Sequence, residues 1–213
     1  LDFSNETFSS PGDDLSQGRN AIAAVSSSSY GYFAGGQTPA ETPTKVDTVD
    51  RIDFSNETTS VPGNELTQAR SWSAAVSNSS YGYFGAGSAV LPVTTVDRID
   101  FSNETTSAPG NNLTEARNIL AALSGGASYR IKGSRTYGYF GGGFGPGPFV
   151  CTIDRLDFSN ETTSAPGNGL PQARRYLAAT SSNFYGYFAG GSAPPSVCTI
   201  HRLDFSNEIT SVL

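Results

Sequence analysis

The chain has 213 residues, of which 24 are Gly and 12 are Pro, and only 15% are charged. So many helix-breaking residues argue against a helical bundle and favour short strands joined by turns. Hydrophobic residues make up 37% and aromatic residues 11% of the chain, which is too much for a disordered protein and enough for a packed core. No stretch approaches the roughly 18 consecutive apolar residues of a membrane-spanning helix, so no membrane span is expected.

The charge balance excludes one class of partner. Nineteen acidic and thirteen basic residues give a net charge of -6, the wrong sign for a protein that must neutralise phosphates, so no nucleic-acid partner is expected. Apart from Lys45 and Lys132, every basic residue is arginine. Arginine suits sites where one fixed side chain must satisfy several acceptors, which indicates structural arginines. A surface rich in Ser, Thr, Asn and Gly indicates an extracellular or virion-surface protein.

The chain repeats itself. The string Asp-Phe-Ser-Asn-Glu begins at residues 2, 53, 100, 157 and 204, and Tyr-Gly-Tyr-Phe begins at residues 30, 81, 137 and 185. An arginine lies 17 residues after the Asp in all four complete repeats, as from Asp2 to Arg19. The lengths vary only after the glycines that follow Tyr-Gly-Tyr-Phe and, once, before its first Tyr. These two places are predicted loops, and the constant stretches are the framework.

Each repeat contains four predicted strands. The first follows the arginine, as at 73–76 and 120–123, and the second is Tyr-Gly-Tyr-Phe, which is rich in strand-forming aromatic residues. The third, as at 48–54 and 95–101, alternates with the period of two expected in a sheet. The fourth is Glu-Thr-Thr-Ser, and it ends at a Pro-Gly-Asn turn.

Four short strands in each repeat of 47 to 57 residues predict an all-β fold, a β-propeller of four-stranded antiparallel blades. The complete repeats run over about 17–62, 68–109, 115–166 and 172–213, within a single domain that spans 1–213. Residues 1–12 add a third-and-fourth-strand pair that a closed four-blade ring would leave spare. The sequence therefore favours a fragment of a longer propeller, with completion by a neighbouring molecule as the alternative.

These repeats resemble the kelch family, in which an Arg-led inner strand precedes an aromatic strand closed by a Gly-Gly pair. The Gly-Gly pair is present in three repeats, and residues 85–87 are an imperfect copy (Gly35-Gly36, Gly142-Gly143, Gly190-Gly191, Gly85-Ala86-Gly87). The family's Arg and Asp match one residue each per repeat (Arg19, Arg70, Arg117, Arg174; Asp53, Asp100, Asp157, Asp204). The family's outer-strand Trp is replaced by Thr or Ser, and Trp72 stands elsewhere. The resemblance thus points to a degenerate, bacterial- or phage-like kelch variant.

The residues that usually bind metals are few. The single His, His201, takes the repeat position of Asp50, Asp97 and Asp154, which predicts a solvated strand residue, with a functional site as the alternative. Cys151 and Cys198 occupy one position in successive repeats. Neighbouring blades hold such positions about 10 Å apart, beyond the reach of a disulfide, so we predict two free, partly buried thiols. No metal site and no cofactor is expected.

The Asp-Phe-Ser-Asn-Glu string has two further interpretations. As a calcium loop it lacks alternating carboxylates and the glycine that such loops require, so hairpin stabilisation by Asx-type hydrogen bonds is favoured. Asn-Glu-Thr, as at Asn56, also matches the N-glycosylation sequence. Glycans are expected only if the protein passes through a eukaryotic secretory route.

An active site requires unique residues brought together, whereas nearly every polar residue here recurs in each repeat. No enzyme is therefore predicted, and function is expected where the repeats differ. The four loops after the glycines would share one face, and the insertion at 125–135 would lie on the opposite face. The candidate partner-binding residues come from these segments (Thr38, Pro39, Pro92, Phe144, Pro146, Pro194, Pro195; Tyr129, Arg130, Lys132, Arg135). The cations of the insertion suit an acidic partner or glycan, or form a solvated loop.

The leading hypothesis is a non-catalytic binding or structural module that recognises a protein or a glycan through its blade-connecting loops. The alternative is a self-assembling subunit of a fibre or lattice, a homo-oligomer joined through the duplicated terminal strands. A weak third is an enzyme whose active residues lie in missing blades.

Overall fold

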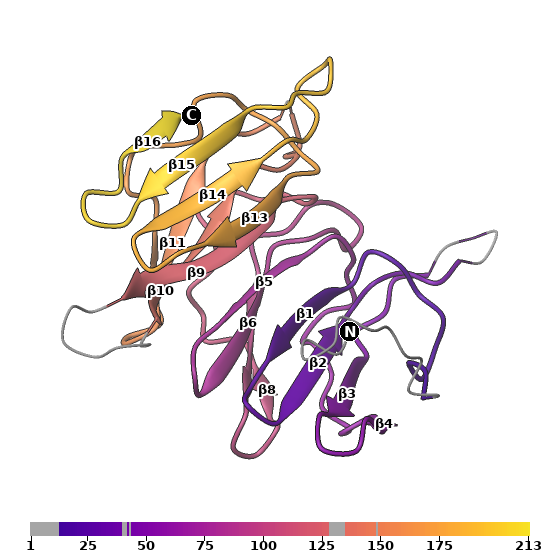
Figure 1. The fold of residues 1–213 in the computed structure, drawn as a ribbon. Coiled ribbons are helices and arrows are strands. Elements are labelled where there is room, and N and C mark those ends of the chain that lie inside the picture. Colours follow the sequence, from indigo (N-terminus) through magenta and orange to yellow (C-terminus); the bar gives the residue numbers. More distant parts are fainter. Residues whose placement is uncertain (1–12, 40–41, 43, 128–134, 148) are drawn as a thin grey trace, which may run out of the picture.

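A computed structural model describes residues 13–39, 42, 44–127, 135–147 and 149–213 (Figure 1). This part of the chain is all-β and forms four antiparallel sheets, each a meander of four consecutive strands. We number these sheets blades 1 to 4 in chain order. The strands are β1 Ala23–Ser26, β2 Tyr30–Ala34, β3 Val49–Asp53 and β4 Thr59–Ser60; β5 Ala74–Ser77, β6 Tyr81–Gly85, β7 Val96–Asp100 and β8 Thr106–Ser107; β9 Ala121–Ala127, β10 Arg135–Gly141, β11 Ile153–Asp157 and β12 Thr163–Ser164; β13 Ala178–Ser181, β14 Tyr185–Ala189, β15 Ile200–Asp204 and β16 Thr210–Val212.

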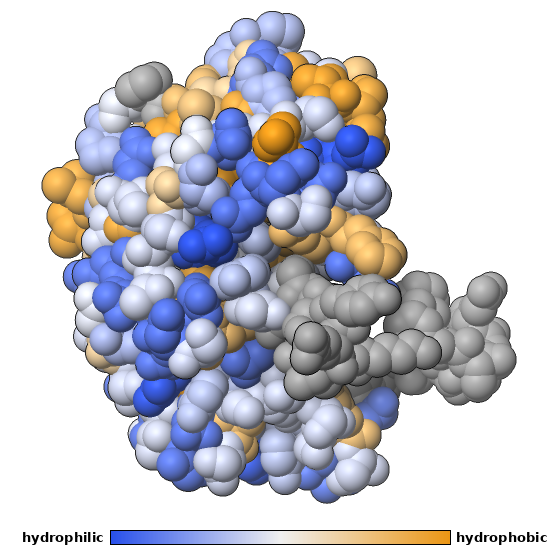
Figure 2. Space-filling model, turned by 90° about the vertical axis from the view of Figure 1, so that its left-hand side faces the viewer, coloured by the Kyte–Doolittle hydropathy of each residue, from blue (hydrophilic) through white to orange (hydrophobic). Residues whose placement is uncertain are grey.

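The sheets are the blades of a propeller, so the predicted fold class is confirmed. Neighbouring blades pack through their first strands, β1 against β5, β5 against β9 and β9 against β13. The array is not closed, because blades 1 and 4 stand at its two ends (Figure 1). On the side of blades 3 and 4 the surface is largely hydrophilic, with separate small hydrophobic patches (Figure 2).

Close packing between blades explains the glycine of Tyr-Gly-Tyr-Phe. A Cβ atom on Gly138 would lie 2.5 Å from Cγ2 of Val76 in the preceding blade, and one on Gly82 would be equally close to Val25. Real side chains do not approach so closely in a packed core. Glycine at this position therefore lets the branched residue of one blade sit directly on the backbone of the next.

The regular spacing of the arginines has a structural cause, as predicted. Arg70 and Arg117 are fully buried at the start of their blades. Nη1 of Arg70 lies 2.7 Å from Oδ2 of Asp97, and Nη2 of Arg117 lies 2.8 Å from Oδ2 of Asp154. Arg70 also donates to the carbonyl oxygen of Phe84. Buried charges are tolerated only when they are paired and hydrogen-bonded, so each pair ties the segment before the first strand to the third strand.

Two sequence predictions about single residues are wrong. His201 is buried at 1% exposure, because its repeat position faces the buried arginine and not solvent. Cys151 and Cys198 are free thiols, as predicted, but they are exposed instead of partly buried. Both cysteines precede their third strands, outside the packed layer between blades.

The Asp-Phe-Ser-Asn-Glu string forms the turn after the third strand, held by Asx-type hydrogen bonds as predicted. Oδ1 of Asp100 accepts from the backbone N–H and the hydroxyl of Ser102. These two bonds lower the pKa of Asp100 below its ordinary value. Oδ1 of Asn103 accepts in the same way from Thr105.

The Glu of this string has a role that the sequence analysis missed. Glu104 has a φ of 59°, and its carboxylate reaches back to the preceding blade. There it accepts from Nη1 of Arg51 at 2.9 Å and from the hydroxyl of Tyr32 at 3.0 Å. Glu161 and Glu208 make the same two contacts with blades 2 and 3. The turn is thus a clamp between blades.

Candidate ligand-binding face

One repeat position combines a different residue in every blade with a positive φ in all four. It lies two residues after the buried arginine and holds Ala21, Trp72, Ile119 or Tyr176, all with φ between 54° and 60°. A positive φ is uncommon for a residue other than glycine, and for a bulky or β-branched residue it is an outlier. A fixed backbone therefore carries four different side chains, and strain of this kind is concentrated at functional sites.

Hydrogen bonds between blades hold this backbone. The N–H of Trp72 donates to the carbonyl of Ala21 at 2.9 Å, that of Ile119 to Trp72 at 3.0 Å, and that of Tyr176 to Ile119 at 3.2 Å. The four residues form a continuous ladder across the array. We call these four residues the rim.

The rim surrounds a cavity of about 300 Å³ with a mainly apolar lining. Trp72 and Tyr176 meet edge to face, with their ring centroids 6.0 Å apart, a favoured geometry for aromatic pairs. Tyr176 keeps 52% of its surface exposed. The remaining wall is aliphatic or small (Ile22, Ser73, Leu120, Leu177). This site combines an apolar floor with one exposed and one half-buried aromatic ring.

The variable loops lie beside the rim, on one face as predicted. Isolated bridges pair the residue before each rim position with the first residue of a loop, as in Ser71 with Ser88 and Asn118 with Phe144. This arrangement follows from the topology, because the loops join β2 to β3, β6 to β7, β10 to β11 and β14 to β15, all at one end of the blades. We call this end the loop face.

Arg175 extends the aromatic surface of the loop face. Its Cζ atom lies 5.1 Å from the ring centroid of Phe144, 5.2 Å from that of Phe149 and 5.0 Å from that of Tyr176. Cations within about 6 Å of an aromatic ring are attracted to its face. The guanidinium thus holds rings from two blades together beside the cavity.

Polar groups complete the loop face. Nζ of Lys45 donates to Oγ of Ser88 at 2.8 Å and to the carbonyl of Ala89, and burial lowers the pKa of this amine below its ordinary value. The loops of blades 1 and 2 are therefore tied together.

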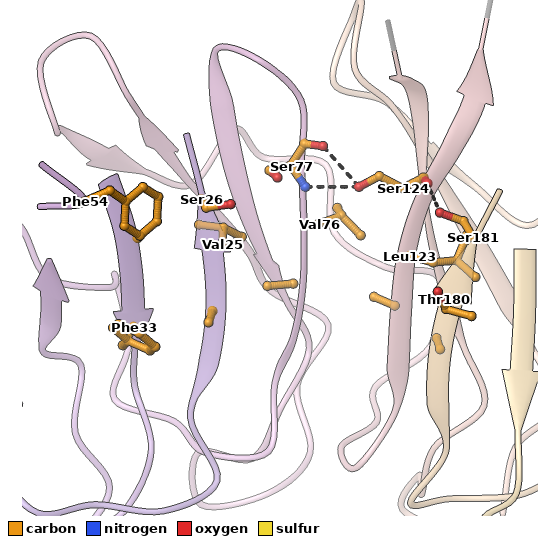
Figure 3. Close-up of a pocket in the computed structure, with 15 residues that line it drawn as sticks. Val25, Ser26, Phe33, Phe54, Val76, Ser77, Leu123, Ser124, Thr180 and Ser181 are labelled. Atoms are coloured by element: carbon orange, nitrogen blue, oxygen red, sulfur yellow. Dashed lines mark hydrogen bonds between the residues drawn. The ribbon is translucent and has the colours of Figure 1, made fainter. Parts of the chain in front are cut away.

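A second cavity, of about 480 Å³, runs between the first strands of the four blades (Figure 3). Its serines already bond between blades: the backbone N–H of Ser77 donates to Oγ of Ser124, and Oγ of Ser181 donates to the carbonyl of Ser124. These serines therefore hold the first strands of blades 2, 3 and 4 together.

The predicted binding residues divide between two ends of the molecule. Thr38, Pro39, Pro92, Phe144, Pro146, Pro194 and Pro195 belong to loops of the loop face. Arg135 begins β10 and pairs with Ala127 at the opposite end, so the insertion partly lengthens a hairpin. Tyr129, Arg130 and Lys132 lie outside the described residues.

Trp72, Tyr176 and Arg175 were not predicted from the sequence to be parts of one site. The available signal was that the position holding Trp72 and Tyr176 differs in every repeat, inside a segment of constant length. Alignment of the repeats makes this position a candidate, but the convergence of the four side chains requires the propeller.

Three further findings concern function. Over the described ranges, no group of three or more His, Cys, Asp or Glu residues could hold a metal ion. In the same part of the chain no helix is long and apolar enough to cross a membrane. No protein-family model matches this chain, and neither does any curated protein.

Proposed function

We propose that this chain is a non-catalytic, kelch-like binding module that recognises a glycan through the loop face. The observation that carries this proposal is the rim, where one strained backbone position presents Ala, Trp, Ile and Tyr around an apolar cavity. A position that varies while its backbone stays constant is typical of a recognition surface built on a rigid scaffold.

The chemistry of the site suits a sugar ring. The C–H groups on the face of a pyranose pack on aromatic rings, and Trp72 with the exposed Tyr176 offers such rings. The sugar's hydroxyl groups need polar partners, and the half-buried Arg175 beside Tyr176 supplies one. At about 300 Å³ the cavity lies at the lower end of the range for small-ligand sites.

Further support comes from the sequence. The Gly pairs and the buried, regularly spaced arginines support kelch-like ancestry. The composition supports a location outside the cell or on a virion surface, where glycans are abundant.

The test is a glycan array probed with the full chain and with the Trp72→Ala and Tyr176→Ala variants. We expect the glycans that bind the wild-type chain to bind each variant at least about tenfold more weakly, as happens when other central aromatic contacts are removed. The control is Phe184→Ala, because Phe184 is 71% exposed but lies in the β13–β14 turn, at the other end of the blade.

Binding that survives both rim substitutions would exclude the rim as the site. If the array stays blank, while a protein captured by the wild type is lost from the Trp72→Ala variant, the ligand is a protein and not a glycan.

A further inference from the structure

All three junctions between consecutive blades share one set of contacts. A Tyr of the second strand stacks on the Phe of the following blade's turn, as in Tyr83 and Phe158, with centroids 5.4 Å apart and planes at 17°. The hydroxyl of this Tyr and an Arg of the third strand, Arg98, both donate to Glu161. In the other two junctions the ring centroids of the equivalent Tyr and Phe lie 5.5 Å and 5.3 Å apart.

Apolar contacts complete each junction. A branched residue of the first strand packs on the glycine of the next blade's second strand, as Val76 does on Gly138. The Phe of that second strand packs back, as the ring of Phe140 does on Gly85. Each blade therefore has a leading face, which supplies Tyr, Arg and the branched residue, and a trailing face, which supplies Phe, Glu and Gly.

The two end blades each present one of these faces without a partner among the described residues. Blade 1 presents the trailing face: Phe54 is 50% exposed, whereas its counterpart Phe158 is 9% exposed. Glu57 is also exposed, but its φ of 58° matches the 59° of the clamped Glu104 and Glu161. The backbone of Glu57 is thus already in the conformation that the clamp uses.

Blade 4 presents the leading face. Tyr187 is half-buried, whereas Tyr83 and Tyr139 are fully buried. The guanidinium of Arg202 lies 4.8 Å over the ring of Tyr185, the position that Arg98 takes over its own Tyr at 4.8 Å. The leading face is therefore preformed as well.

We propose that two copies of this chain associate head to tail, the leading face of blade 4 in one copy docking on the trailing face of blade 1 in the other. Arg202 and Tyr187 would then clamp the partner's Glu57, and Tyr187 would stack on the partner's Phe54. Opposite charges, matching ring pairs and preformed geometry on both faces select a second copy as the occupant.

Such a contact is heterologous, and it continues into a filament unless the rotation closes a ring. Two copies supply eight blades, within the range of about four to eight blades with which propellers close. A closed pair satisfies both end faces at once, and the ring leaves only short, protected sheet edges. This interface is separate from the loop face, so the glycan proposal and this one stand or fall independently.

The experiment measures the mass of the full chain by light scattering between about 1 and 100 µM, a range suited to interfaces of moderate strength. We expect the mass to rise from the 22.3 kDa of one chain to twice that value or more. Glu57→Arg and Arg202→Glu should each weaken association by about tenfold or more, because each places like charges opposite one another.

An equimolar mixture of the two variants should associate again, because position 57 of one variant and position 202 of the other then carry opposite charges. The matched control is Glu65→Arg, which changes an exposed charge outside both faces. Circular dichroism checks that every variant is folded. A folded wild type that stays at 22.3 kDa across this range overturns the proposal, as does a failure of the mixture to recover.

One other occupant is distinguished by the same measurement. Phe3 and Glu6 repeat Phe54 and Glu57 in the sequence, so the chain's own first residues could supply a trailing face. If Glu6→Arg weakens association while Glu57→Arg has no effect, blade 1 is not the docking surface and the proposal is wrong.

Discussion

Nε2 of His201 lies 2.7 Å from Nη2 of Arg174 in blade 4, where the other blades pair the buried arginine with an aspartate. The cause is a second change in the same blade. In blades 2 and 3 the aspartate also accepts from the backbone N–H and the hydroxyl of Thr67 or Thr114. Blade 4 has Pro171 at that position, and proline supplies neither donor. A neutral imidazole therefore replaces a carboxylate that would have lost two hydrogen bonds.

The first prediction concerns pH. Burial, and then the charge of Arg174, lower the pKa of His201 to about 4, whereas an unfolded histidine titrates near 6.5. Between these values the unfolded chain binds more protons, so stability is complete above about pH 6.5 and is lost as the pH falls toward 4. The loss attributable to His201 is up to about 3 kcal/mol.

Urea unfolding at several pH values between 7.5 and 4.5 measures this loss. A His201→Gln variant is the control, because it keeps a neutral polar side chain and removes the titration. As the pH falls, the free energy of unfolding of the wild type should drop to that of the variant or below it. Parallel stability curves for the two proteins would contradict the assignment.

The second prediction tests the coupling of His201 with Pro171. His201→Asp alone restores an ion pair to Arg174 but leaves carboxylate lone pairs unsatisfied, so little stability is gained. The double variant Pro171→Thr with His201→Asp restores the donors as well. Its gain in free energy of unfolding should exceed the sum of the gains of the two single variants by about 1 kcal/mol or more. A double-mutant cycle by thermal unfolding measures the difference, and simple additivity would show that the two positions are independent.

The third prediction concerns the buried ion pair of Arg117 and Asp154. Arg117→Ala leaves a carboxylate with 0% exposure without its cation, and removing one partner of a buried pair costs about 3–5 kcal/mol. Arg202→Ala is the matched control, because this arginine is half-buried at an end of the array. It should cost less than about 1 kcal/mol in the dissociated chain. If Arg117→Ala and Arg202→Ala lower the midpoint of denaturation equally, the buried pair has no special role.

The fourth prediction concerns the clamp between blades 2 and 3. Burial, with the carboxylate of Glu161 next, raises the pKa of Tyr83 well above its ordinary value, so the phenol remains a donor at all ordinary pH values. Tyr83→Phe keeps the stacked ring and removes one hydrogen bond, which costs about 1 kcal/mol. Tyr187→Phe is the control at the end of the array. If Tyr187→Phe loses as much stability as Tyr83→Phe in dilute solution, the clamp is contradicted.

The fifth prediction concerns Gly138. Its φ lies outside the left-handed region, so the cost of Gly138→Ala arises from the contact of the new Cβ atom with Val76 at 2.5 Å. Overpacking of this kind costs about 1–3 kcal/mol. Adding Val76→Ala should recover part of that loss, and Gly18→Ala, with no atom within 4 Å, is the neutral control. No recovery in the double variant would place the strain elsewhere.

Much of the fold could be predicted from the sequence because each blade repeats its own local signals. The period-two alternation of Val96–Asp100, the aromatic run from Tyr81 and the Asx hydrogen bonds of Asp100 all act within a few residues of one another. Local rules of this kind are readable in any single repeat, and four copies remove the ambiguity of one.

What the tertiary structure decided concerns residues that lie far apart in the chain. Whether His201 is solvated or buried depends on Arg174, 27 residues away, and the role of Glu104 depends on Arg51 in the preceding blade. The rim depends on all four blades at once, since Trp72 and Tyr176 meet only when the array curves. Composition and spacing thus determined the blades, whereas burial, charge pairing and the convergence of side chains depend on long-range packing, which no local pattern encodes.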